Sequence, residues 1–273
     1  MKRRLFFSLG LATLVAMLVA ACGGDSGTAT TQPQATQAQA TQVQATQIAA
    51  TPTQAGMSEA AKFGGTLRVV SQASVESLDM SFTGAWVTTV IAAHLWDRLF
   101  EPASDYSVHP QMVDTWTVSS DGSSWTFTLR DGLKFHDGSN VTSADVIPSL
   151  KRIWVTQAHG QLMDANLAPD GARVIDNKTF SLTFNRPVGF VAEGLAAPWP
   201  FSNIYPKRVM DAFPAQSDHG RENAIGSGPY KLKTWERGNR IILERFDDYI
   251  KRSDPADNLA GAKHAYLDEI IWL

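Results

Sequence analysis

Cysteine is almost missing from this chain of 273 residues, since Cys22 is the only one. A single cysteine excludes an intramolecular disulfide, so the fold must be held together by its core. Signatures of common catalytic sites are missing as well. The six histidines are not at zinc-ligand spacing, and the chain contains no H-E-x-x-H, P-loop or G-x-S-x-G segment. We therefore expect a protein that is not an enzyme and that uses no cofactor or resident metal.

A basic surface is missing too. The chain has 24 Lys and Arg against 27 Asp and Glu, a formal net charge of −3. The first 56 residues hold three basic residues and one acidic residue, so the rest of the chain carries a net charge of −5. No basic cluster is interleaved with aromatic residues, as a nucleic-acid-binding surface would require. We expect no nucleic-acid partner.

The one long hydrophobic run lies at the N-terminus. Three basic residues precede an apolar stretch from Leu5 to Ala20, which is too short and wrongly flanked for a stable membrane span. The run ends in Val19-Ala20-Ala21-Cys22, and small residues before a cysteine resemble a lipobox. This pattern predicts that residues 1–22 are a lipoprotein signal peptide, with Cys22 as the lipid anchor in the membrane. The alternative is an ordinary secretory signal that happens to contain a cysteine.

Residues 23–62 consist almost entirely of small and polar residues, mainly Thr, Gln and Ala. They have too few large apolar side chains to offset the entropy cost of ordering the chain. We expect a disordered tether that holds a globular body away from the membrane. The body would run from Phe63 to Leu273, long enough for one domain or two small lobes.

Hydrophobic periodicity predicts a mixed α/β body. A helix is expected over residues 86–100, and the sequence Thr142-Ser-Ala-Asp145 is typical of a capping box that opens another helix. Trp125 and Trp116 are assigned to the core of two predicted strands. Asp-Gly pairs at 121–122, 131–132 and 137–138 predict tight turns. The predicted strands are 65–71, 116–118, 125–129, 174–175, 180–184, 230–236, 241–246 and 267–273.

Two polar segments invite a catalytic interpretation. Phe135-His136-Asp137-Gly138 could place a histidine and a carboxylate in an active or metal site, but its Asp-Gly pair favours a tight turn. Gly226-Ser227-Gly228 resembles a phosphate loop, but Pro229 follows it and argues against a helix opening there. We interpret this second segment as a bend that leads into the strand beginning at Tyr230.

The stretch from Met112 to Arg152, MVDTWTVSSDGSSWTFTLRDGLKFHDGSNVTSADVIPSLKR, carries a longer pattern. It resembles the signature region of the extracellular solute-binding proteins that serve peptide and nickel ABC importers (family 5). Three later segments also match that family's motifs: Ile225–Tyr230, Glu244–Tyr249 and Leu267–Trp272. The resemblance covers essentially all of residues 63–273.

This resemblance implies an α/β fold of the periplasmic-binding-protein type II. It further implies a main lobe formed by residues 63–100 and 199–273, with a β-rich subdomain, 101–198, inserted between them. Family members are considerably longer and have a second lobe, so we expect that this lobe is absent and that the chain is an N-terminal part of the fold. That expectation allows a fragment, a truncated product or an incomplete gene model.

The implied function is the lipid-anchored substrate-binding component of an ABC importer for peptides or related solutes. The site would be a cleft bordered by aromatic residues, with Phe82, Thr83, Trp86, Trp199 and Phe201 as substrate-binding residues. Core packing is the competing interpretation for each of them. Closure of two lobes over the solute would be the mechanism, so this chain alone should bind peptides weakly or not at all.

The expected partners are an oligopeptide or similar small solute, ABC permease subunits and the membrane. The protein would be a monomer on the extracytoplasmic side, in a periplasm or on the outer face of the cytoplasmic membrane. Two alternatives stay open: a one-lobed surface lipoprotein with a sensory or adhesive role, and binding of nickel or another metal chelate.

Overall fold

A computed structural model describes residues 62–273, apart from 157, 198–201 and 214–216. The predicted signal peptide, Cys22 and nearly all of the predicted tether lie outside the described residues. The described residues belong to one compact unit of the chain. Within them, no helix is both long enough and apolar enough to cross a membrane.

The described part is mixed α/β. Its helices are α1 (Trp86–Leu95), α2 (Ser143–Thr156), α3 (Ala158–Asn166), α4 (Val191–Leu195) and α5 (Lys207–Ala212), with a short 3-10 helix, η1 (Arg221–Asn223). Its strands are β1 (Thr66–Val69), β2 (Phe100–Pro102), β3 (Val108–Pro110), β4 (Val113–Val118), β5 (Ser124–Leu129), β6 (Leu167–Val174), β7 (Thr179–Phe184), β8 (Tyr230–Glu236), β9 (Arg240–Arg245) and β10 (Glu269–Trp272).

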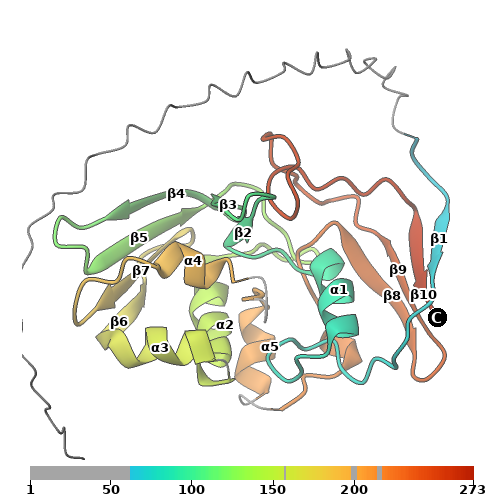
Figure 1. The fold of residues 1–273 in the computed structure, drawn as a ribbon, viewed down its shortest axis with the longest axis horizontal. Coiled ribbons are helices and arrows are strands. Elements are labelled where there is room, and N and C mark those ends of the chain that lie inside the picture. Colours follow the sequence, from blue (N-terminus) through green and yellow to red (C-terminus); the bar gives the residue numbers. More distant parts are fainter. Residues whose placement is uncertain (1–61, 157, 198–201, 214–216) are drawn as a thin grey trace, which may run out of the picture. The chain divides into compact units, whose positions relative to one another are not determined.

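Two four-stranded sheets organise these elements. One has the strand order β1-β10-β9-β8, in which β1 and β10 run parallel and the other pairs are antiparallel. The other has the order β4-β5-β7-β6 and is antiparallel throughout. Figure 1 shows α1, α2 and α5 between the two sheets, and a small β2-β3 hairpin above them. The first sheet joins chain segments about 200 residues apart, so the chain leaves it after β1 and returns at β8.

Two hydrophobic cores accompany the two sheets. The α1 core gathers buried side chains from the segment before α1, from α1 itself and from the first sheet; it includes Leu78, Ile91, Leu95, Trp96, Tyr205, Leu243 and Ile270. The α2 core gathers those of the second sheet and α2; it includes Phe100, Trp125, Phe127, Leu150, Trp154, Phe180 and Ile204. Because the two apolar cores are separate, they are joined by polar contacts and by the continuous main chain.

Several sequence predictions are confirmed. The hairpins 174–184 and 230–246 form, and Trp125, Phe127 and Leu129 are buried on one face of β5 while their neighbours are more exposed. The three glycines of the Asp-Gly pairs all have positive φ. The capping box also forms: the Asp145 carboxylate accepts hydrogen bonds of 2.8 Å from both the N–H and the hydroxyl of Thr142. Asp145 therefore fixes the start of α2.

Two sequence predictions are wrong. The helix expected over 86–100 ends at Leu95, because the backbone turns extended at Trp96 and the Leu95 carbonyl accepts the N–H of Gly228. Trp116, assigned to the core, is 41 % exposed. It faces the same side as its register partner Phe127 and contacts the ring of Phe100, but it lies on β4, the edge strand of its sheet, and stays partly exposed.

The bend at Gly226-Ser227-Gly228 is explained by close packing on the end of α1. A Cβ atom on Gly226 would lie 1.8 Å from the Leu95 carbonyl oxygen, so only glycine fits there. His136 closes the bend from the other side: its Nδ1 accepts the Gly226 N–H at 3.1 Å, and its Nε2 lies 3.1 Å from the Gly228 carbonyl. The two motifs that invited a catalytic interpretation thus pack against each other, and their contacts are structural.

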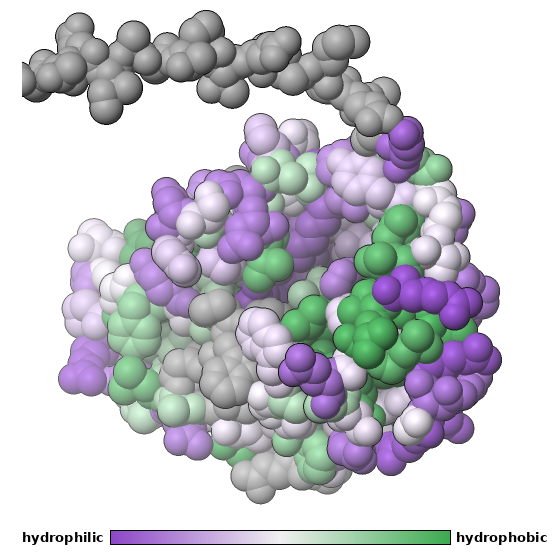
Figure 2. Space-filling model, turned by 45° about the vertical axis from the view of Figure 1, so that its right-hand side comes forward, coloured by the Kyte–Doolittle hydropathy of each residue, from purple (hydrophilic) through white to green (hydrophobic). Residues whose placement is uncertain are grey.

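Strand β1 is the open edge of the first sheet. Parallel strands are usually covered on both faces, yet three of the four β1 residues are exposed. Apolar Leu67 and the following Val70 are among the exposed hydrophobic side chains. Figure 2, in which this side of the molecule comes forward, shows hydrophobic surface interrupted by hydrophilic side chains.

Candidate functional site

The segment that leads from β1 into α1 contains three of the predicted substrate-binding residues. Phe82 is 51 % exposed and Trp86 is 75 % exposed, while Thr83 is half-buried between them in sequence. Such exposure is unusual for large aromatic side chains and argues against core packing for these two. We call residues 82–86 the aromatic segment. The other two predicted residues, Trp199 and Phe201, lie outside the described residues.

The main chain of the aromatic segment is open at Gly84, while the N–H of Ala85 donates to the Thr83 hydroxyl at 3.2 Å. Ala85, at the N-cap of α1, is extended and offers no side-chain cap to the helix. Among the described residues, none forms a hydrogen bond with the N–H or carbonyl of Gly84. The first turn of any helix leaves N–H groups without intrahelical partners. One residue with open main-chain groups, Gly84, therefore lies between two exposed aromatic side chains.

A hollow lies at the carboxyl ends of β1 and β10. It holds about 230 Å³ and is lined by the segment Ser71–Val75, by the β8-β9 turn and by Trp272. The indole Nε1 of Trp272 is buried and has no hydrogen-bond partner among the described residues. In open α/β sheets, ligands bind outside the carboxyl ends of parallel strands. The aromatic segment follows this hollow in the chain, on the same β1-α1 connection.

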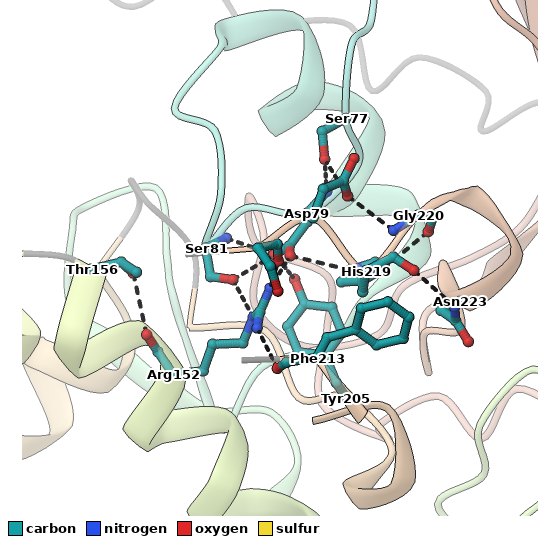
Figure 3. Close-up of polar contacts among 12 residues, drawn as sticks. Ser77, Asp79, Ser81, Arg152, Thr156, Tyr205, Phe213, His219, Gly220 and Asn223 are labelled. Carbon is teal, nitrogen blue, oxygen red and sulfur yellow. Dashed lines mark hydrogen bonds and ion pairs between the residues drawn. The ribbon is translucent and has the colours of Figure 1, made fainter. Parts of the chain in front are cut away.

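Beneath the aromatic segment lies a buried ionic network, which we call the Asp79 network and which comprises Asp79, Ser81, Arg152, Tyr205 and His219 (Figure 3). Asp79 and Arg152 form an ion pair with almost no exposure on either side chain. The other carboxylate oxygen, Oδ1, accepts the Ser81 N–H at 2.9 Å and the Ser81 hydroxyl at 2.6 Å. The Tyr205 hydroxyl lies 3.5 Å from the same oxygen, and burial next to the Asp79 charge raises the pKa of Tyr205.

Arg152 is the centre of this network. It comes from α2, and its Nε donates to the Ser81 hydroxyl at 2.5 Å. Its two terminal nitrogens donate to the carbonyl oxygens of Phe213 and Ser217. One guanidinium therefore connects α2, the segment before α1 and the chain that follows α5. A planar fork with five N–H donors suits this task, and an ammonium group would not.

His219 completes the network and raises the question of a metal. Ligand atoms of Asp79, Asp218 and His219 all lie within 4.8 Å of one another. The ring Nδ1 lies 3.0 Å from the Gly220 carbonyl, while Nε2 lies 3.7 Å from the Asp79 carboxylate and has no hydrogen-bond partner among the described residues. The Arg152 guanidinium already neutralises Asp79, and a cation beside it would be repelled. The arrangement therefore favours an ion-pair network over a metal centre.

A second ionic cluster, the Asp97 network, comprises Asp97, Arg98, Glu101, Tyr249 and Lys263. The Lys263 ammonium lies 2.7 Å from Asp97 and 3.0 Å from Glu101, and Glu101 also pairs with Arg98. The Tyr249 hydroxyl donates to Asp97 at 2.9 Å. Burial lowers the pKa of Arg98 to about 9 and also lowers the pKa of Lys263, against the pull of Asp97. This network joins the two cores without contacting the aromatic segment.

Sequence reasoning missed the Asp79 network, although a signal was available. Asp145, Ser149 and Arg152 are spaced i, i+4 and i+7, so they form one polar stripe on α2. All three are buried. A buried polar stripe on a helix requires partners elsewhere in the chain. The sequence could therefore have predicted buried partners for Arg152, but not that Asp79 is one.

Comparisons with known proteins agree with this architecture. Residues 107–273 match the family model for the middle part of the bacterial extracellular solute-binding proteins, family 5. A probable peptide ABC transporter periplasmic-binding protein, y4tO of Sinorhizobium fredii, is 35% identical over 192 residues, which are 70% of this chain and 35% of that protein. The di/tripeptide-binding protein 4 of Pseudomonas aeruginosa is 28% identical over 218 residues, covering 72% of this chain and 40% of the relative.

Solved structures show the same relationship. The binding protein AgaA from A. tumefacien R10, in complex with agropinic acid, aligns with a TM-score of 0.61 and 29% identity, over 76% of this chain and 39% of that one. The oligopeptide-binding protein AppA from Bacillus subtilis, in complex with a nonapeptide, has the same fold, with a TM-score of 0.62, 23% identity and coverage of 77% and 40%. The predicted periplasmic-binding type II fold is thus confirmed.

The chain spans little more than a third of the length of the curated relatives that it matches. Those relatives are extracytoplasmic binding proteins, and their family is one of solute binders, not enzymes. Fold, motifs and sequence identity agree. The chain belongs to the bacterial extracellular solute-binding proteins of family 5.

Proposed function

We propose that this chain provides part of the substrate-binding component of an ABC importer for short peptides or related solutes. The most similar relatives support a peptide-like solute, since they are named for peptides, di- and tripeptides, or glutathione. The complex of AgaA with agropinic acid extends the range to other small solutes. Cys22 would carry the lipid that holds the protein at the extracytoplasmic side of a membrane.

The two cores support a division into a main lobe and an inserted subdomain. The α1 core draws on residues from 78–96 and 205–270, and the α2 core on residues from 99–204. We therefore propose the main lobe as 63–100 with 199–273, and the subdomain as 101–198. The solute would meet the main lobe.

The single observation that supports the site is the open main chain of Gly84 between two exposed aromatic side chains. The free N–H and carbonyl groups of Gly84 can pair with the main chain of a peptide, as in strand addition. Phe82 and Trp86 would flank the solute with apolar surface, and Thr83 would add a hydroxyl. Main-chain pairing is independent of the side chains of the solute, which suits a transporter of varied peptides. Trp199 and Phe201 are proposed as further aromatic walls of the same cleft.

Contact from one side only should give weak binding. In two-lobed binding proteins, a solute that touches both lobes favours the closed form by its differential affinity, and the closed form then docks on the permease. The described residues offer the solute one wall. We expect dissociation constants in the millimolar range, on the order of 4 kcal/mol of binding free energy or less. We expect the protein to act as a monomer.

The test is a titration of the full chain with trialanine and with glutathione. Binding is measured by the line broadening of the peptide NMR signals. We expect broadening that Trp86→Ala reduces about fivefold, a typical effect of losing an aromatic contact. Trp116→Ala is the matched control, because that tryptophan is also exposed but lies on β4. Nanomolar affinity, or equal losses in both variants, would contradict the proposed site.

A further inference from the structure

A residue from the α2 core lies beneath the aromatic segment. Arg152 belongs to α2, which packs in the α2 core, yet its guanidinium lies beneath the segment that precedes α1. It is 4 % exposed, so water cannot replace its contacts. The link across the two cores is therefore direct: one side chain donates to the segment before α1 and to the chain after α5.

Asp79 and Ser81 connect Arg152 to the aromatic segment by hydrogen bonds. The Asp79 carboxylate, held by Arg152, accepts the N–H of Ser81, while the Asp79 carbonyl accepts the N–H groups of Phe82 and Thr83 at 3.0 Å each. The N–H groups of Ser81, Phe82 and Thr83 thus all donate to Asp79. The next residue, Gly84, has an open main chain among the described residues.

A second contact fixes the helical end of the segment. The Thr88 hydroxyl, in the first turn of α1, donates to the Ser77 carbonyl at 2.7 Å. The turn 79–83 is therefore held at one end by α1 and in its middle by Arg152. If the Arg152 contact were loosened, the middle of the turn would be the part free to move.

We propose that Arg152 is a positioning residue for the aromatic segment: through Asp79 and Ser81 it sets where Phe82, Thr83 and the open main chain stand. The proposal deepens the proposed function and rests on it for what the segment binds. It assigns to the subdomain helix α2 a role in the solute site of the main lobe, although no α2 side chain needs to touch the solute.

A purely structural role must be separated from a positioning role. Arg98 offers the matched control, because it is an equally buried arginine at the junction of the two cores. It pairs with Glu101 and donates to the Ala197 carbonyl at 2.8 Å, away from the turn 79–83. Arg152→Lys and Arg98→Lys should both lower stability, since lysine keeps the charge but loses the fork.

The experiment is amide hydrogen exchange of the full chain without any ligand, resolved at Ser81, Phe82 and Thr83. We expect these amides to exchange on the order of tenfold faster in Arg152→Lys, because their hydrogen bonds all end on Asp79. Arg98→Lys should leave them within about twofold of the unmodified chain. Ser81→Ala, a milder change if Arg152→Lys does not fold, should accelerate Phe82 and Thr83 about threefold.

Unchanged exchange at the three amides in both Arg152→Lys and Ser81→Ala would overturn the proposal. An equal acceleration in Arg98→Lys would also overturn it, since the effect would then report only on stability. The readout needs no solute, so its failure would leave the peptide-binding proposal untouched. Failure of the peptide titration would, in turn, leave the exchange result standing.

Discussion

The Asp79 network and the Asp97 network solve the same problem with different geometry. Both join two hydrophobic cores through mostly buried charges, and both pair carboxylates with cations that are at most 13% exposed. In the Asp79 network, one arginine of α2 donates to Asp79 and Ser81 on the segment before α1 and to two carbonyl groups on the chain that follows α5. In the Asp97 network, the carboxylates of Asp97 and Glu101 share Lys263, and Glu101 also holds Arg98.

Burial and charge therefore do not by themselves indicate a role in the site. The Asp79 network contacts the turn that leads into the aromatic segment. The Asp97 network instead lies where the chain passes from α1 into β2, from one core to the other. Disruption of either should destabilise the protein, but disruption of the first alone should disturb the aromatic segment.

Asp79→Ala should cause the largest loss of stability. It leaves the Arg152 guanidinium buried without its carboxylate, which costs about 3–5 kcal/mol in comparable buried pairs. Urea unfolding followed by circular dichroism measures the loss. Asp218→Ala is the control, because that carboxylate is only partly buried and should cost about 1 kcal/mol. A loss below about 1 kcal/mol for Asp79→Ala would mean that the pair contributes little.

Lys263→Met should cost about 3 kcal/mol, because Asp97 loses its ammonium partner while Glu101 keeps Arg98. The same unfolding experiment gives the number. Amide exchange at Ser81, Phe82 and Thr83 should stay as in the unmodified chain. If those amides exchanged faster, the two networks would not be functionally distinct.

His136 should make stability depend on pH. Burial lowers the pKa of His136 to about 4, partly offset by its hydrogen bond to the Gly228 carbonyl. The folded protein holds this ring neutral, so the unfolded chain takes up the extra proton as the pH falls. The contribution is complete above pH 6.5, is lost between about 6.5 and 4, and amounts to at most about 2 kcal/mol for a partly exposed ring.

The measurement is the free energy of unfolding at a series of pH values for the unmodified chain and for His136→Asn. Asparagine can also accept from Gly226 and donate to Gly228, but it does not titrate in this range. The difference between the two curves isolates His136 from the other histidines. Parallel curves between pH 4 and 6.5 would contradict the assignment.

Lys207→Ala should have the smallest effect. Its ion pair with Asp211 is half-exposed on both sides and joins i and i+4 on α5, so it should contribute less than about 0.5 kcal/mol. Unfolding with and without 1 M salt checks this, because salt screens an exposed pair and leaves a buried one nearly unchanged. A loss above 1 kcal/mol, insensitive to salt, would be the contrary result.

Local patterns predicted much of the fold. The alternation around Trp125, the Asp-Gly turns and the capping box at Thr142 depend on near neighbours, and all of them formed. The end of α1 at Leu95 could not be predicted, because it is set by Gly228, more than 130 residues later. Trp116 failed for a similar reason: its exposure follows from the position of β4 at a sheet edge, which composition does not encode.

The candidate site divides in the same way. The resemblance pointed to Phe82, Thr83 and Trp86, and the structure places them together on one connection. The ion pair beneath them joins residues 73 positions apart and was missed, because no local pattern links Asp79 to Arg152. Polar pairs between residues far apart in the chain are the feature of this protein that its sequence does not predict.

The most direct test of the proposed binding site is a map of amide chemical-shift changes in the ¹⁵N-labelled full chain on addition of trialanine. We expect the largest changes on residues 82–86, at millimolar peptide concentrations. Changes that fall elsewhere on the molecule, or no changes at residues 82–86 at those concentrations, would contradict it.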